Sequence, residues 1–589
     1  MGAGVSELLK IWRSPASAFG KFSDRYDPSE EETWNVLDAY TDDELKRIAD
    51  SGFNAIWVHA LLHHIVQTPD YPELGIDAAE HQRRLNGLID RAAQYGLSVF
   101  LYMQPPRALP EKHELFRNHP EIMGQRELAQ GCDYDETFTV CSMCTSLSSV
   151  KAYLYNSAAE LARQLPGLGG IILITASEFP AHCWSRRGNT ITAFGDREYK
   201  DIECPHCRRR DPCEVAGEVI QLMRAGIRSE NSAMKIIVWN WSWTMYENPP
   251  CRKIISGLPQ DVTLLADFER GGKRVILGKE RDIDEYSLGY AGPSEQFIES
   301  WKLAESCGLQ IMAKLQIGTT HELATVANLP VIGNVYQKAV KILEMKLAGF
   351  MGTWNFGNMI TANTAALNFF LDQTAPVDQN AALKNFADYY FPGANAEKIV
   401  AAWDLFGEAM ASYPFSIPFL YAGPANFACI LPMKPAPLSG TPVGRSWLPD
   451  ERGDDMSAAL SPYCIEEVIE GFTALVERWD RGVDILSAGL KNINSVHAGQ
   501  ELDNATVCGC LFASTLHFSQ VYALRKNWDD ASLPEYRRII SSEIENLKKL
   551  LPLVEKDSRF GYHIESHGYQ FDAQRIKAQI KELTKQLTG

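Results

Sequence analysis

Helical and strand-like segments alternate along the first 360 residues of the chain. Residues 41–52 have the pattern of a capped helix that stops at a glycine, and the strand-like residues 54–59 follow directly. The same unit returns as a helix that stops at Gly96 and a strand over residues 98–104. Because such alternation is typical of parallel strands joined by helical crossovers, we predict an α/β fold.

Eight strand-like segments occur in this part of the chain. They cover residues 18–22, 54–59, 98–104, 171–176, 235–243, 262–269, 309–318 and 350–357, and the first is the least regular. Eight strand–helix units can close into a barrel. The rival fold, a doubly wound open sheet, usually carries a glycine-rich phosphate loop, and the sequence has no GxGxxG or Walker-type loop. We therefore predict a (β/α)8 TIM barrel.

The pattern changes after about residue 360. Residues 361–415 and 455–589 have helical periodicity, and the segment 416–452 between them is rich in Pro and Gly, which predicts a long loop. We therefore predict two domains, a barrel at 1–360 and a mostly helical C-terminal domain at 361–589. The hydrophobic content of 45% is sufficient for at least one large core.

The chain is acidic, with 57 Lys and Arg against 74 Asp and Glu and a net charge of −17. This balance argues against nucleic acid or an anionic membrane surface as a partner, since both favour clustered Lys and Arg. No apolar run approaches the ~20 residues that span a bilayer, and the first residues lack the layout of a secretory signal. We expect a cytoplasmic protein, or a secreted one if a leader has been removed.

Glu178 follows the apolar residues 171–176, which have the composition of a strand buried on both faces. The carboxyl ends of barrel strands carry the chemistry in (β/α)8 enzymes, so we predict that Glu178 is catalytic. The alternative is an ordinary loop carboxylate paired with Arg186 or Arg187.

Two further carboxylates, Asp267 and Glu269, end the strand-like residues 262–269. Because alternate residues of a strand point to the same face, we expect both at the mouth that Glu178 reaches. Glycoside hydrolysis needs such a pair: one carboxylic acid protonates the leaving oxygen, and one carboxylate acts as nucleophile or activates water. A separation of ~5 Å predicts retention of configuration and ~6.5–9.5 Å predicts inversion.

Aromatic and amide side chains gather at the same strand ends. Sugar rings stack on indole, and amides or imidazoles bind sugar hydroxyl groups. The predicted substrate-binding residues are His59, Gln104, Trp239, Asn240, Trp241, Gln316, Trp354 and Asn355. The alternative for the Trp residues at 239, 241 and 243 is that some of them face the helix layer as core.

Thirteen cysteines are scattered through the chain, and four of them have spacings that suit a structural zinc site. The predicted ligands are Cys183, Cys204, Cys207 and Cys213. Competing ligands are Cys141, Cys144, His182 and His206, and the other alternative is a set of reduced cysteines without metal. We predict no organic cofactor.

The segment CTSLSSVKAYLYNSAAELARQLPGLGGIILITASEFPAHC resembles the fourth β/α unit of barrel glycoside hydrolases related to the β-N-acetylhexosaminidases. The segment GTWNFG is similar to the Trp-bearing last strand of such enzymes. The resemblance implies that Glu178 is the general acid. In hexosaminidases an Asp precedes this Glu and orients the substrate acetamido group, whereas this chain has Ser177. The second role therefore falls to Asp267 or Glu269.

These features together predict an exo-acting glycoside hydrolase with carbohydrate as its partner. The segments 282–293 and 557–571 are expected to close over the pocket, or, for 557–571, to form an interdomain contact. The alternatives are a polysaccharide lyase, a metal-dependent barrel hydrolase and a non-catalytic carbohydrate-binding protein. The oligomeric state is left open, a homo-oligomer included.

Overall fold

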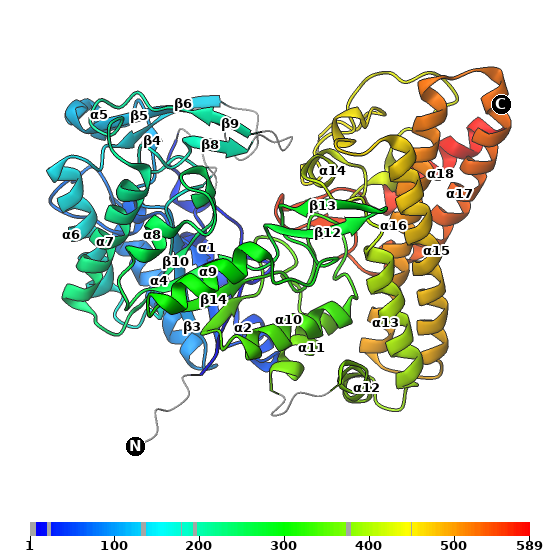
Figure 1. Cartoon of the computed structure of the whole chain (residues 1–589), viewed down its shortest axis with the longest axis horizontal. Helices are drawn as coiled ribbons and strands as arrows, with labels where there is room; N and C mark the ends of the chain where they lie inside the picture. The colour runs from blue at the N-terminus through cyan, green and yellow to red at the C-terminus, as the bar shows by residue number, and fades with distance from the viewer. Residues whose placement is uncertain are drawn as a thin grey trace.

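The computed structural model describes residues 7–20, 25–130, 137–177, 179–191, 197–372, 378–448 and 450–588. Eight parallel strands form a closed barrel in the order β1-β15-β14-β11-β10-β7-β3-β2, which confirms the predicted fold (Figure 1). The barrel strands are β1 Leu9–Trp12, β2 Ala55–His59, β3 Ser98–Met103, β7 Gly170–Ile174, β10 Lys235–Trp239, β11 Thr263–Asp267, β14 Gln310–Lys314 and β15 Gly349–Met351.

The first barrel strand lies earlier in the chain than predicted. Residues 18–20 have no regular structure, residues 21–22 lie outside the described part of the chain, and β1 is instead Leu9–Trp12. In β1, Ile11 belongs to the cluster inside the barrel and Trp12 to the core outside it. The two side chains therefore point to opposite faces. Ile11 is in register with Ala55 of β2 and with Met351 of β15, so the short segment is a barrel strand.

Helices surround the barrel, and glycines lie where the chain turns from two of these helices to the next strand. The described helices of this part are α1 Glu32–Ala39, α2 Asp42–Asp50, α3 Leu62–Ile65, α4 Ala78–Ala93, α5 Glu114–Asn118, α6 Ser148–Gln164, α7 Pro212–Glu230, α8 Arg252–Ser256, α9 Glu295–Ser306, α10 Ile332–Glu344 and α11 Ala362–Leu371. Gly52 and Gly96, shortly after α2 and α4, have φ angles of +88° and +71°. Glycine adopts this left-handed conformation at low cost, so the chain reverses there.

Short sheets extend from the strand ends. They comprise β4 Leu109–Pro110, β5 Met123–Gln130 and β6 Thr137–Met143 in one sheet, the hairpin β8 Gly188–Ile191 with β9 Arg197–Lys200, and the hairpin β12 Gly272–Ile276 with β13 Lys279–Ile283. Figure 1 shows the first two above the barrel and β12–β13 between the barrel and the C-terminal helices. These excursions follow β3, β7 and β11, so they lie around the mouth where the strands end.

The C-terminal region is helical. Its helices are α12 Gln379–Tyr390, α13 Ala396–Met410, α14 Ile417–Ala422, α15 Ile465–Gly489, α16 Val496–Lys526, α17 Leu533–Lys556 and α18 Ala573–Thr588. Helix α14 lies inside the segment 416–452 predicted to be a loop. It forms because the Ser416 side chain accepts a hydrogen bond from the backbone of Phe419 and Pro418 suits the first helical turn.

Helix α16 is, within the described residues, the one helix that is long and apolar enough to cross a membrane by length and composition. The sequence-based statement that no segment has this length was therefore wrong. In the protein, 72% of its most apolar window is buried. Core helices of this kind pass the same test, because they are apolar on all sides.

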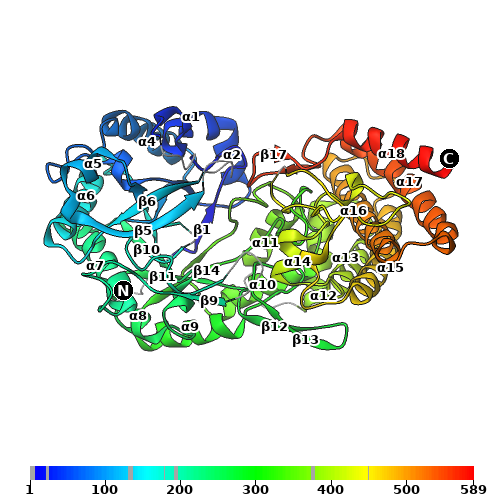
Figure 2. The ribbon, with the colours of Figure 1, turned by 90° about the horizontal axis from the view of Figure 1, so that it is seen from above.

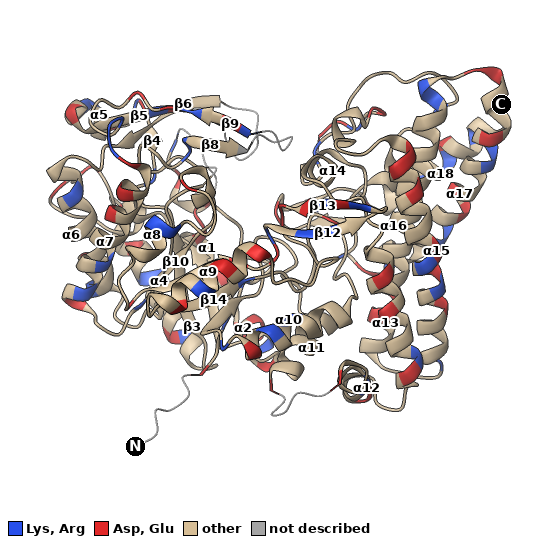
Figure 3. Ribbon diagram, viewed as in Figure 1, with Lys and Arg blue, Asp and Glu red and all other residues tan. Residues whose placement is uncertain are grey.

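Charges are mixed on the surface of the C-terminal helices. Figure 3 shows acidic and basic segments interspersed along α13, α15 and α17 in this view. Some of these charges form exposed pairs, such as Lys548 with Glu545 on α17. Such pairs contribute little to stability and are typical of a solvated face.

The end of the chain returns to the barrel. A short hairpin, β16 Tyr562–His563 with β17 Gly568–Tyr569, lies between the barrel and the C-terminal helices (Figure 2). Ile564 of this hairpin is buried in the same cluster as Trp57 and Trp239 inside the barrel. The segment 557–571 therefore covers part of the barrel mouth.

Candidate active site

Asp267 is the last residue of β11 and points into the barrel mouth. The indole Nε1 of Trp239, on the neighbouring strand β10, donates a hydrogen bond of 2.8 Å to Asp267 Oδ1. Arg270 Nη1 lies 3.8 Å from Asp267 Oδ2, and the residue is 9% exposed. The carboxylate is thus held in one orientation and still reaches the mouth.

Several groups set the protonation of Asp267. Burial raises its pKa to about 6, and the negative charge of Glu285 adds to the rise. The positive charges of Arg270 and Lys314 and the hydrogen bond from Trp239 act in the opposite direction. A carboxyl group that titrates near neutral pH can take part in general acid–base or nucleophilic catalysis.

A cavity of about 240 Å³ opens beside Asp267. It is lined by polar side chains from the loops after β10 and β11 and from the β8–β9 hairpin, among them Asn189, Arg197, Asn240, Arg270 and Asp284. The described wall therefore offers amide and guanidinium donors next to a carboxylate, which suits a ligand rich in hydroxyl groups.

Trp354 lies at the centre of an aromatic group inside the mouth. It stacks on Trp57 with ring centroids 5.4 Å apart and makes edge contacts with Tyr102 and Trp239 at 5.4 Å and 5.2 Å. Trp354 is only partly buried, so part of its ring remains open to the mouth. An indole held in this way can stack on the apolar face of a sugar.

His59 is the last residue of β2, and Gln104 directly follows β3, at the same mouth. The His59 ring packs against Phe19 at 4.6 Å, and burial lowers its pKa well below the ordinary value, so it is neutral at physiological pH. Gln104 Nε2 donates hydrogen bonds to Tyr102 Oη at 3.2 Å and to Ser177 Oγ at 2.8 Å, and its Oε1 accepts one from Arg107. Gln104 therefore orients neighbouring groups.

The remaining predicted binding residues divide into two groups. Asn240 lines the cavity, and Trp241 is partly buried with the Arg270 guanidinium 5.2 Å from its ring centre. Gln316 is fully buried, with its side-chain amide bonded to Thr319 O and its oxygen to the Trp354 backbone. Gln316 thus positions Trp354.

Asn355 is buried beside Trp354, and its Oδ1 has no hydrogen-bond partner among the described residues. A buried amide oxygen of this kind is costly unless water or a ligand satisfies it. Asn355 therefore remains a candidate for ligand binding.

Glu269 does not lie at the mouth, contrary to the prediction. It is fully buried and forms an ion pair with Lys338 of α10, and its Oε1 also accepts a hydrogen bond of 3.2 Å from the Gln316 backbone. Strand β11 ends at Asp267, so the alternation of faces does not extend to residue 269. The ion pair joins the loop after β11 to a helix of the outer layer.

Glu178 lies outside the described residues. Its neighbours Ser177 and Phe179 follow β7 at the barrel mouth, and Ser177 Oγ accepts the hydrogen bond from Gln104. The Ser177 backbone N–H donates to Ser185 O at 3.0 Å, which closes the loop around position 178.

Three groups at the mouth were not singled out as site residues from the sequence. Glu285, after β13, accepts a hydrogen bond of 2.6 Å from Tyr421 Oη, and Lys314 is buried with Nζ 4.0 Å from the ring centre of Tyr286.

The third group could hold a metal ion. His321 and His563 come together with Glu565, with one potential ligand atom of each within 4.8 Å of the others. Both ring nitrogens of His563 lack a hydrogen-bond partner in the described part of the chain. In the sequence, the histidines of the segment 557–571 could have indicated this group.

The cysteine group differs from the prediction by one residue. The sulfur atoms of Cys144, Cys183, Cys204 and Cys207 lie within 4.8 Å of one another, and all four residues are buried. Cys213, the fourth predicted ligand, lies outside this group, in the first turn of α7. Cys144 takes its place because the end of β6 lies against the loop after β7.

Comparisons with known proteins agree with the architecture. No family model and no curated protein matches the sequence. Among solved structures, a GH138 enzyme targeting pectin rhamnogalacturonan II is similar over 99% of this chain and 67% of its own, with 10% identity and a TM-score of 0.57. A chitobiase from Flavobacterium johnsoniae matches 98% of this chain and 78% of its own, with 10% identity and a TM-score of 0.34.

The first of these similarities defines the class by fold: a (β/α)8 barrel followed by a helical region. The second has too low a TM-score to support an argument. At 10% identity the comparison establishes the fold alone, so function must be argued from the site.

Proposed function

We propose that the protein is a glycoside hydrolase that removes a terminal sugar, with Asp267 and Glu178 as its two carboxylates. The observation that carries the proposal is a buried carboxylate, Asp267, at the carboxyl end of a barrel strand, fixed by the indole N–H of Trp239, which belongs to the aromatic cluster of the mouth. Catalytic residues of (β/α)8 enzymes come from such strand ends.

Asp267 acts in its ionised form as nucleophile or general base. With a pKa of about 6 it is mostly ionised at pH 7, and the positive charges of Arg270 and Lys314 favour that form. Trp239 holds Oδ1, so Oδ2, which has Arg270 Nη1 3.8 Å away, is the oxygen that would face the sugar or a water molecule.

Glu178 acts as the general acid. It follows β7, which is separated from β11 by the single strand β10, and the strand ends therefore face one mouth. Neighbouring strands lie about 4.8 Å apart, so β7 and β11 lie about 10 Å apart, and side chains that lean toward each other from their ends can flank one glycosidic bond.

A hexosaminide is the sugar that the sequence resemblance suggests first, but substrate-assisted catalysis is not part of the proposal. The residue before Glu178 is Ser177, whose hydroxyl already accepts a hydrogen bond from Gln104. A serine cannot supply the negative charge with which an Asp would polarise an acetamido group. The second carboxylate must come from the protein, and Asp267 is the described residue placed to supply it.

The covered mouth supports exo action. Ile564 of the C-terminal hairpin and Tyr286 of the segment 282–293 are both buried in the cluster that fills the mouth. A mouth covered on this side forms a pocket for the end of a chain, whereas an endo-acting enzyme needs an open cleft.

The test is hydrolysis of aryl N-acetylhexosaminides, hexosides, uronides and sialosides by the wild type, Glu178→Gln, Asp267→Asn and the exposed control Glu198→Gln. Loss of a general acid or nucleophile should reduce kcat at least ~100-fold on one sugar, with binding retained. Full activity of both site variants would contradict the assignment. Sugar binding by all four proteins without turnover would indicate a binding protein, and an unsaturated product would indicate a lyase.

A second candidate, a metal-dependent hydrolase, is favoured by the group His321, His563 and Glu565. Two buried imidazoles and a carboxylate within 4.8 Å of one another could hold a divalent cation at the mouth. Activity that disappears with a chelator and with His563→Ala, and returns on adding metal to the wild type alone, would favour this candidate over the carboxylate pair.

A further inference from the structure

We propose that Cys144, Cys183, Cys204 and Cys207 bind one zinc ion that fixes the loop after β7. The four side chains come from three separate places: the end of β6, the loop that follows β7, and the CPHC turn before α7. The metal would thus join the excursion after β3 to the excursion after β7.

The spacing of the sulfur atoms fits a single tetrahedral ion. Cys144 Sγ lies 3.6 Å from both Cys204 Sγ and Cys207 Sγ, and all four sulfur atoms lie within 4.8 Å of one another. Zinc–sulfur bonds of about 2.3 Å place the corners of a tetrahedron about 3.8 Å apart. All four cysteines are free, so no disulfide accounts for their approach.

The surroundings also suit a closed structural site. A Cβ on Gly124 would lie 2.5 Å from Cys183 Sγ, so glycine leaves the space that the sulfur occupies. Trp184, Ile202 and Val215 pack around the group and exclude water. Four thiolates leave no open coordination position, so this ion would have no catalytic role.

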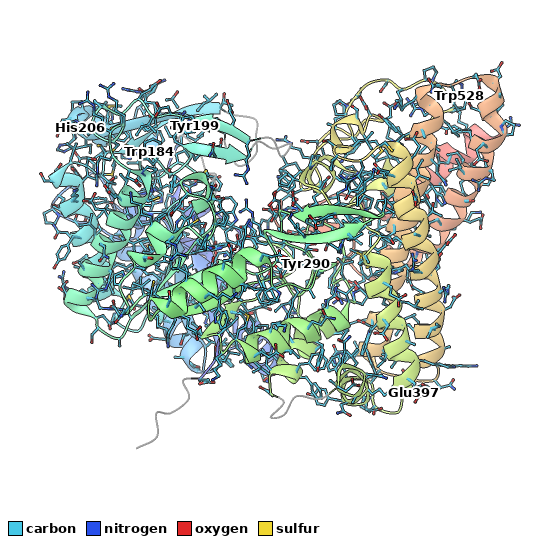
Figure 4. All side chains as sticks on the ribbon, in the orientation of Figure 1. Trp184, Tyr199, His206, Tyr290, Glu397 and Trp528 are labelled. Atoms are coloured by element: carbon cyan, nitrogen blue, oxygen red, sulfur yellow. The ribbon has the colours of Figure 1, made fainter. Side chains whose placement is uncertain are left out.

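Groups beyond the sulfurs hold the ligands in place. Ser146 Oγ lies 3.1 Å from Cys207 Sγ, and Trp184 Nε1 donates a hydrogen bond of 3.2 Å to Cys207 O. Figure 4 shows Trp184, His206 and Tyr199 in the same upper part of the barrel domain. Outer contacts of this kind fix the orientation of metal ligands.

The consequence for the mouth follows from the position of Cys183. It lies five residues after position 178 in the same loop, and Ser185, two residues further on, accepts the hydrogen bond from the Ser177 backbone. Loss of the metal would leave four buried thiols without a common partner and release this loop. The effect on catalysis rests on the proposed function, whereas metal binding does not.

The experiment is elemental analysis of protein purified without chelator, for the wild type, Cys207→Ser and Cys213→Ser. Cys213 is a matched control because it is buried, lies six residues from Cys207 and stands outside the sulfur group. We expect about one zinc per chain in the wild type and in Cys213→Ser, and less than about 0.2 in Cys207→Ser. Zinc below about 0.2 in the wild type, or equal loss in the two variants, would overturn the proposal.

A second measurement covers the case in which Cys207→Ser does not fold. Wild-type protein produced with cobalt in place of zinc should show the intense thiolate-to-cobalt absorption of a tetrahedral sulfur site. Weak absorption typical of nitrogen and oxygen ligands would place the metal at His321 and His563 instead and contradict the proposal. Because neither measurement depends on turnover, failure of the zinc site and failure of the proposed function can be told apart.

Discussion

Trp239 and Asp267, on neighbouring barrel strands, are joined by a hydrogen bond of 2.8 Å from the indole nitrogen to the carboxylate. The indole fixes one carboxylate oxygen and favours the charged form, while burial opposes that charge. The pair therefore holds a carboxyl group close to the point where it changes protonation in the neutral range.

We expect Asp267→Asn to lose at least ~100-fold in kcat on the sugar that the wild type hydrolyses, because asparagine can accept the indole hydrogen bond but cannot act as nucleophile or base. Steady-state kinetics with an aryl glycoside measures the change. Circular dichroism should show an unchanged fold. Activity within threefold of the wild type would exclude a catalytic role for Asp267.

The pH dependence of kcat/KM should fall on the acid side with a midpoint near pH 6, where Asp267 becomes protonated. Trp239→Phe removes the hydrogen bond that favours the carboxylate, so the midpoint should move up by about 0.5–1 pH unit. Trp243→Phe is the matched control, because the Trp243 indole donates to Thr175 Oγ1 and not to a carboxylate. Equal shifts in both variants would contradict this explanation.

Asp267 should also reduce stability at neutral pH. Its native pKa of about 6 lies above the ordinary value of 3.8, so the native state binds more protons than the unfolded state between these values. The free energy of unfolding falls as pH rises through that window, by up to about 3 kcal/mol. Urea unfolding should show Asp267→Asn gaining stability relative to the wild type from pH 4 to pH 7; an equal difference at both values would contradict this.

The buried pair of Lys338 and Glu269 gives a prediction about stability alone. Lys338→Met leaves the Glu269 carboxylate buried and unpaired, so we expect a loss of about 3–5 kcal/mol in the free energy of unfolding. The double variant Glu269→Met/Lys338→Met should recover most of this loss, since no charge remains buried. Denaturant unfolding tests both, and a single-variant loss below about 1 kcal/mol would show that the pair is not a structural requirement.

Most of the barrel could be predicted because seven of its strands are apolar runs bounded by glycines and helices. Strand β1 was misplaced because only Ile11 and Trp12 of its four residues are fully buried, whereas Phe19 is conspicuous in sequence but lies outside any strand. A strand this short is specified by its neighbours β2 and β15, and sequence periodicity does not contain that information.

Site residues at strand ends could be predicted from the sequence, whereas groups formed by segments distant in the sequence could not. Asp267 follows from its place at the end of an apolar run, but the burial of Glu269 depends on Lys338 of α10. Cys144 is sixty residues from Cys204, so spacing alone favoured Cys213, which is nearer in the chain. Both errors concern contacts that only the folded chain creates.

The hairpin that carries Ile564 has a consequence for biosynthesis. All eight barrel strands have been synthesised once Met351 has been translated, yet the covering of the mouth waits for Ile564, which follows the helices α12–α17. A nascent or truncated chain that ends before the hairpin would expose the indoles of the mouth to water and to chaperones. The barrel mouth can thus be covered only after the chain has passed through the long helices α15–α17 and reached Ile564.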